Sequence, residues 1–111
     1  MSCLSKPHRL NSTKEFNALY KYAKKWHTDS FVAFYKPDEE LKLAFVTSKK
    51  IGNAVLRNKA RRRLRALFLS YENSIKLGKY IFVAKEKINE NDFEKLKKDF
   101  NFAFKRLEIF K

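Results

Sequence analysis

The chain has 111 residues, with 26 Lys and Arg against 12 Asp and Glu, so its formal net charge is +14. Hydrophobic residues make up 44% of it, including 11 Phe and 5 Tyr, which predicts a folded core and argues against a wholly disordered chain. The single Cys excludes an internal disulfide, and no apolar run approaches the roughly 20 residues that span a bilayer. The charge favours a polyanionic partner, nucleic acid ahead of an anionic membrane surface.

The N-terminal part is predicted to be a basic arm followed by a helix, within one domain covering residues 1–111. Residues 1–10 have the composition of a flexible arm. Ser12 followed by Glu15 is a capping-box pattern, and apolar residues at helical spacing then predict a helix over 13–25.

Two strands are expected next, on either side of an acidic turn. Residues 30–36 and 41–48 alternate and are rich in aromatic and β-branched side chains, as is typical of strands. The connection over 37–40 (PDEE) is short, so we expect the two strands to pair antiparallel.

The second half predicts helix, strand, helix. A helix is expected over 56–71 and a fully apolar strand over 80–84. Asn89 or Asn91 would cap a last helix over 92–107. Its expected core residues are Phe93, Leu96, Phe100, Ala103 and Leu107. The order helix-strand-strand-helix-strand-helix predicts an α/β (α+β) two-layer sandwich with one small sheet.

The stretch from 48 to 65 has the strongest functional signal. It holds eight basic residues and no acidic one, and no Asp or Glu occurs anywhere from 41 to 71. Arg57, Arg61 and Arg65 recur every fourth residue and would form a ridge along the helix. Solvated helix faces normally mix charges of both signs, whereas arginine forks match phosphate oxygens. The pattern therefore favours a phosphate-binding surface over an ordinary solvated face.

The segment KKIGNAVLRNKARRRLR, residues 49–65, closely resembles the signature of the bacterial ribonuclease P protein subunit. The resemblance extends to RLNSTKEF at 9–16 and to FVAFY at 31–35. Lys59 and Ala60 depart from the family pattern, which more often has Arg and a larger apolar residue there. The resemblance implies a small sandwich with a left-handed βαβ crossover, a fold also found in a ribosomal protein domain.

The resemblance also implies a function. The chain would join a catalytic RNA that, with Mg²⁺, removes the 5′ leader of precursor tRNA in the cytoplasm, as an endoribonuclease producing 5′-phosphomonoesters. The chemistry would belong to the RNA, with no catalytic and no metal-binding residue in this chain. The implied contacts with the catalytic RNA are Lys49, Lys50, Asn53, Arg57, Asn58, Arg61, Arg62 and Arg65. Those with the single-stranded leader are Phe16, Tyr20 and Phe34, whose rings suit unpaired bases.

The sequence also allows other interpretations of these aromatic residues and of the function. Phe16 and Tyr20 are four residues apart and would equally suit a helix core. A non-catalytic RNA-binding module, such as a ribosomal-type protein, would share the charge. A helix-turn-helix DNA-binding protein fits poorly because the first half is rich in strands, and a membrane-surface helix fits poorly because a sheet is available to cover it. We therefore expect neither DNA nor a membrane as partner.

Overall fold

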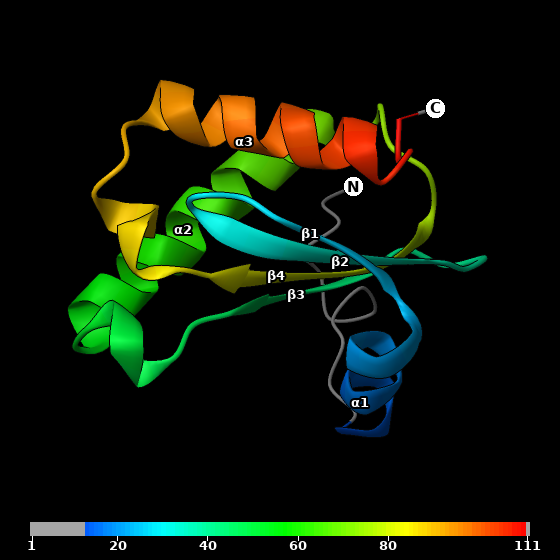
Figure 1. Cartoon of the computed structure of the whole chain (residues 1–111), viewed down its shortest axis with the longest axis horizontal. Helices are drawn as coiled ribbons and strands as arrows, with labels where there is room; N and C mark the ends of the chain where they lie inside the picture. The colour runs from blue at the N-terminus through cyan, green and yellow to red at the C-terminus, as the bar shows by residue number, and fades with distance from the viewer. Residues whose placement is uncertain (1–12, 111) are drawn as a thin grey trace.

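A computed structural model describes residues 13–110 as one four-stranded sheet with helices on both faces (Figure 1). The helices are α1 (Thr13–Tyr22), α2 (Ala54–Tyr71) and α3 (Phe93–Arg106), with short 3-10 helices η2 (Lys49–Ile51) and η3 (Glu86–Asn89). The strands are β1 (Lys24–His27), β2 (Phe31–Pro37), β3 (Lys42–Val46) and β4 (Gly78–Ala84). The predicted α+β sandwich is confirmed: α2 and α3 cover one face, and α1 crosses part of the other. The predicted arm, 1–10, and the predicted cap, Ser12, lie outside the described residues.

The expected pairing of the strands over 30–36 and 41–48 is wrong. The strand order is β1-β2-β4-β3, so β4 lies between β2 and β3. β4 pairs antiparallel with β2 and parallel with β3. The physical reason is the composition of β4, which is buried along nearly its whole length. A hairpin of β2 and β3 would leave this apolar strand at an edge, whereas a central position buries both of its faces.

The predicted first helix is too long, because its last residues form a fourth strand. α1 ends at Tyr22, and β1 pairs antiparallel with β2 at the edge of the sheet. Four residues are too few to show a strand period in the sequence. Trp26 anchors β1 to the rest of the protein, because its side chain packs against the main core.

The connection from β3 through α2 to β4 is left-handed (Figure 1). When the sheet is viewed from the α2 side with both strands pointing up, β4 lies to the left of β3. The general rule for such units is right-handed, so the topology expected from the resemblance is confirmed against the general rule.

The main core is a set of aromatic rings between the sheet and the pair α2 and α3. Phe82 of β4 lies at its centre, and its ring centroid lies within 6.2 Å of six others. Those six are Phe31, Phe45, Phe68, Tyr80, Phe100 and Phe104. Burial raises the pKa of the Tyr80 hydroxyl, so this group stays neutral.

A polar contact fastens the turn between β1 and β2 to α3. Ser30 Oγ donates a hydrogen bond to Asp99 Oδ2 at 2.6 Å, and both residues are buried. Lys95 Nζ lies 2.9 Å from the other carboxylate oxygen of Asp99. Because each partner is satisfied, the turn and the helix are held in one relative position.

The last helix begins at a different residue from the one expected. Asp92, rather than Asn89 or Asn91, is its N-cap, and its side chain accepts from the Lys95 N–H at 2.8 Å. The prediction of Phe93 as a core residue is wrong, since 46% of its surface is exposed. The first turn of α3 lies beside α2, where Phe93 borders a groove together with Lys59.

We expect Gly78→Ala to lower the free energy of unfolding by about 1–3 kcal/mol. Gly78 has a φ of 157°, and a Cβ there would lie 2.6 Å from the Lys36 carbonyl oxygen. The backbone of β2 would have to move away from β4 to make room. Urea unfolding followed by circular dichroism would measure the change, with Lys76→Ala, in the loop just before β4, as the control. An unchanged midpoint for Gly78→Ala would contradict this account.

Candidate nucleic-acid interface

The basic helix α2 is positioned by its cap and by one apolar stripe. Asn53 is the N-cap, and its Oδ1 accepts from the Leu56 N–H at 3.0 Å, so the helix starts two residues before the predicted position. Ala60, Leu64, Leu67 and Phe68 are buried against the core. This stripe leaves the arginine-rich face of the helix outside the core.

Four of the predicted RNA contacts come together on this face. Asn58, Arg61, Arg62 and Arg65 line a shallow groove of about 470 Å³, together with Val55. Val55 is 72% exposed; it lies in the segment that resembles the family signature but was not predicted as a site residue, because it carries no charge.

Arg61 is held in place by neutral partners. Its guanidinium donates to Thr47 Oγ1 at 2.8 Å and to Asn58 Oδ1 at 2.6 Å. Neither partner carries a charge, so Arg61 keeps its positive charge while its orientation is restricted. Arg63 is different, because it donates to the Ile88 carbonyl oxygen and serves to join α2 to η3.

The remaining predicted contacts lie apart from that groove. Lys49, Lys50 and Asn53 are exposed in the connection before α2, and Arg57 is half-buried. Buried Ile51 anchors this connection, and Gly52 takes a φ of 134° to join η2 to the cap. Asn53 itself is in an extended conformation.

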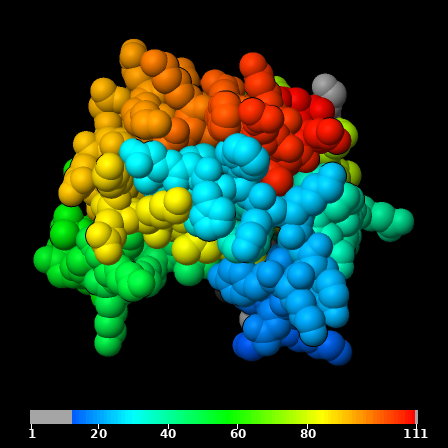
Figure 2. Space-filling model, in the orientation of Figure 1, coloured from blue at the N-terminus to red at the C-terminus, as the bar shows by residue number. Residues whose placement is uncertain are grey.

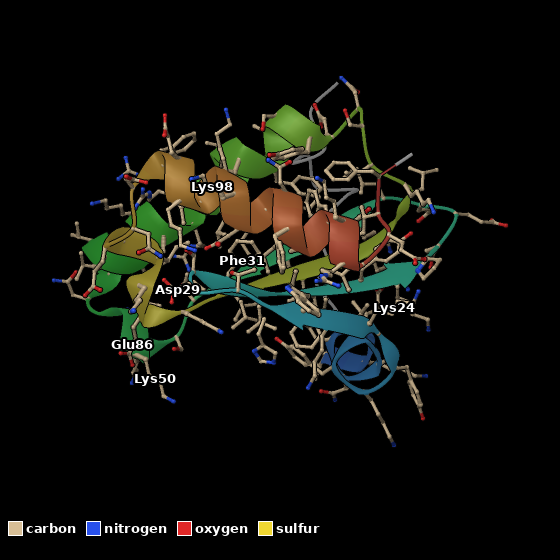
Figure 3. All side chains as sticks on the ribbon, turned by 45° about the horizontal axis from the view of Figure 1, so that its top comes forward. Lys24, Asp29, Phe31, Lys50, Glu86 and Lys98 are labelled. Carbon is tan, nitrogen blue, oxygen red and sulfur yellow. The ribbon has the colours of Figure 1, made fainter. Side chains whose placement is uncertain are left out.

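Lys50 belongs to a second groove, at the end of the sheet where β3 and β4 finish. This groove encloses about 810 Å³, and its wall includes His27, Val83, Lys85 and Lys87. Lys50 and Glu86 project from this end of the molecule (Figure 3). Sequence reasoning missed His27, Lys85 and Lys87, because they come from separate segments that only the fold brings together.

The three aromatic residues predicted to contact the leader lie together where α1 packs on the sheet. The Tyr20 ring lies 5.1 Å from that of Phe34, nearly perpendicular to it, and 6.2 Å from that of Phe16. Tyr20 is 43% exposed, Phe16 is half-buried and Phe34 is 9% exposed. Partial burial raises the pKa of the Tyr20 hydroxyl, so it remains a hydrogen-bond donor at neutral pH.

Beside these rings, the sheet presents an apolar row that α1 does not fully cover. The register places Val32, Val83 and Val46 side by side on β2, β4 and β3, and all three are half-buried. His27 on β1 continues the row at the edge. Figure 2 shows the molecule hollowed below the sheet, between α1 and the segment joining β3 to α2. We call this row, together with Phe16, Tyr20 and Phe34, the α1 cleft.

Several of the described carboxylates pair with lysine side chains. Glu15 lies 3.6 Å from Lys42 Nζ and 3.8 Å from Lys79 Nζ, which ties α1 to the ends of β3 and β4. In the range 13–110, no three His, Cys, Asp or Glu side chains gather in a group that could hold a metal ion. No helix in that range is long and apolar enough to cross a membrane.

Comparison with known proteins gives a consistent result. A family model described as ribonuclease P matches residues 4–108. A ribonuclease P protein component from Nitratiruptor is 39% identical over 89% of this chain and 91% of the relative. One from Bacillus pumilus is 33% identical over 96% of this chain and 93% of the relative. The fold of this chain also matches that of the Staphylococcus aureus RNase P protein, with a TM-score of 0.83 and 24% identity. The match covers 94% of this chain and 98% of the Staphylococcus aureus chain.

Proposed function

The chain belongs to the ribonuclease P protein family, and from that premise we propose how its surfaces divide the work of the ribonucleoprotein. Ribonuclease P is an endoribonuclease that processes the 5′ end of tRNA, and this chain is its protein subunit. An RNA is therefore among its partners. We propose that the α2 groove binds the catalytic RNA and that the α1 cleft binds the leader of precursor tRNA.

The α2 groove suits a folded RNA because it offers fixed, uncompensated arginines. Arg61, Arg62 and Arg65 line one groove, and no carboxylate from residues 13–110 lines it with them. Such guanidinium groups bind phosphates without first breaking an internal ion pair. Lys49, Lys50, Asn53 and Arg57 would extend this contact along the connection and the first turns of α2.

The α1 cleft suits an unpaired strand, and the open apolar row beside Tyr20 is the observation that carries this proposal. A row of half-buried valines next to an exposed aromatic ring can take bases by stacking and apolar contact, whatever their sequence. Leaders differ between tRNAs, so a sequence-tolerant surface is what such a substrate requires. Exposed Lys50 at the adjoining end groove would bind phosphates, whereas Lys85 and Lys87 there are engaged by the Thr28 carbonyl oxygen and by Asp29.

We propose that Mg²⁺ is held mainly by the RNA and that no side chain of this protein acts in the bond cleavage. The described residues offer no cluster of ligands, and Glu15, Asp29, Asp38 and Asp99 each lie beside a lysine. This chain's residues would bind and orient the two RNAs. The setting would be the cytoplasm.

Cleavage of a leader-bearing precursor tRNA by a bacterial ribonuclease P RNA tests the whole proposal. At low, near-physiological Mg²⁺ we expect accurate 5′ processing only when this protein is present. RNA binding without stimulation, repeated with the cognate RNA, would instead favour a non-catalytic RNA-binding module. No observation on the described residues favours that alternative.

Tyr20→Ala tests the cleft. We expect it to weaken binding of leader-bearing precursor tRNA about tenfold, the loss of roughly one stacked base, and to leave mature tRNA nearly unaffected. Tyr20→Phe should retain most of the affinity because it keeps the ring. Tyr22→Ala is the matched control, since Tyr22 is on the same helix but 69% exposed. Equal losses for both tRNAs would assign Tyr20 a purely structural role.

A further inference from the structure

The edge strand β1 has two faces that look toward different layers of the molecule. Lys25 and His27 are in register with Phe34 and Val32, so they share the face of the α1 cleft. Trp26 is in register with Ala33 and packs against the main core on the α3 side. β1 is therefore the border between the α1 cleft and the surface of α3.

On the α3 side of this border, three side chains form a cationic aromatic cluster. The rings of Trp26 and Phe102 lie 5.7 Å apart. The Arg106 guanidinium carbon lies 5.3 Å from the centroid of the Trp26 ring and 5.1 Å from that of Phe102. Phe102 is 49% exposed and Arg106 is exposed. We call these three residues the Trp26 platform.

The segment of α3 that carries the platform, residues 95–106, is mostly positive. From residue 95 to 106 the only acidic residue is Asp99, which is buried and engaged by Ser30 and Lys95. Lys98 and Lys105 lie within one turn of Phe102 on α3, and Lys24 precedes Trp26 on β1; Lys24 and Lys98 are labelled in Figure 3.

Arg106 is held by rings and not by a carboxylate, and this matters for what it can bind. Stacking on Trp26 and Phe102 restricts the guanidinium without neutralising it. The contacts that position its guanidinium are these two rings, so its N–H groups can reach phosphate oxygens. The exposed face of Phe102 offers a stacking site for an unpaired base.

The α1 cleft leads to this platform. Its apolar row ends at Val46 on one side, next to Thr47, which binds Arg61 of the α2 groove. On the other side the row ends at His27, next to Trp26. A single-stranded RNA that enters from the α2 groove and follows this row of side chains would leave the cleft over β1. In Figure 2, α3 (orange to red) lies directly along the β1 side of the molecule.

We propose that the Trp26 platform binds the distal part of the single-stranded leader after it has left the α1 cleft. This inference rests on the proposed function of the cleft and adds a second leader site. A protein partner is disfavoured, because Lys24 and Lys25 at the free edge of β1 oppose pairing with another strand. The ring contacts would otherwise serve only to clip α3 to the edge of the sheet, and the experiment separates the two roles.

The test compares leaders of two lengths in the assembled ribonucleoprotein. Precursor tRNAs with leaders of about 4 and about 16 nucleotides span the site sizes of single-strand grooves. For Phe102→Ala with Arg106→Gln, we expect affinity for the long leader to fall 5- to 10-fold and affinity for the short leader to stay unchanged. Phe93→Ala with Lys97→Gln is the matched control, as it removes an exposed ring and a cation from the same helix.

A second variant and a cleft variant make the outcomes distinct. Lys98→Gln with Lys105→Gln leaves the rings in place and should also weaken only the long leader, by a smaller factor. Equal long-leader affinity in wild type and both platform variants would overturn the proposal, and so would equal losses for both lengths. Altered self-association in sedimentation without a change in leader binding would show a protein contact instead. If Tyr20→Ala affects neither leader, the proposed function of the cleft itself has failed.

Discussion

Replacing Arg61 and Arg65 together with alanine is expected to weaken binding of the catalytic RNA about 30-fold at physiological salt. The estimate takes about 1 kcal/mol for each lost charged contact. Both arginines line the α2 groove, and Arg61 is held there by Thr47 and Asn58. The slope of log K against log salt should also become shallower, by about 2, because two fewer counterions are released.

The matched control removes the same charge elsewhere. Lys36→Ala with Lys76→Ala deletes two exposed cations from β2 and from the loop before β4, neither of which lines the α2 groove. Filter binding over a range of salt concentrations, with circular dichroism to verify folding, would measure both pairs. If the two pairs lose the same affinity, the RNA senses only net charge and the groove has no special role.

Phe82→Ala is expected to lower the free energy of unfolding by about 3–5 kcal/mol. Phe82 is fully buried, and its ring contacts residues from β2, β3, α2 and α3. Truncation leaves a cavity where all of these elements meet, so relaxation at one cannot close it. Small domains are stable by only about 5–15 kcal/mol, so the variant should be partly unfolded at 37 °C.

Urea denaturation of the free protein would measure this effect, with Phe93→Ala as the control. Phe93 is 46% exposed, and its truncation should change the free energy of unfolding by about 0.5 kcal/mol or less. Similar losses for the two variants would mean that Phe82 is not the centre of the core.

The sequence predicts helices well here and the sheet poorly, for a physical reason. Helical periodicity is local, so Ala60, Leu64 and Leu67 identify the buried side of α2 without knowledge of any partner. Strand order depends on contacts between distant segments. The insertion of β4 between β2 and β3 follows only from the need to bury an apolar strand on both faces, which no local pattern expresses.

In the candidate site, too, residues on one helix could be predicted from the sequence, whereas groupings of residues from distant segments could not. The arginines of α2 were predicted because one helix carries them, and Asn58, Arg61, Arg62 and Arg65 do share a groove. Phe16, Tyr20 and Phe34 were named from a resemblance, and the fold brings their rings into contact. The open valine row could not be predicted, because it consists of single residues from three strands.

The central position of β4 also constrains how the chain folds as it is synthesised. β2 and β3 are made first, yet neither is the other's partner, and both must wait for residues 78–84 to emerge. Until then the sheet has only the antiparallel pair β1 and β2, and α2 has no complete surface to pack on. Pairing of β2 with β4 closes a long loop that contains all of α2, a slow type of step. A chain truncated before β4 would therefore carry the whole arginine ridge but have only the pair β1 and β2 in place of the complete sheet.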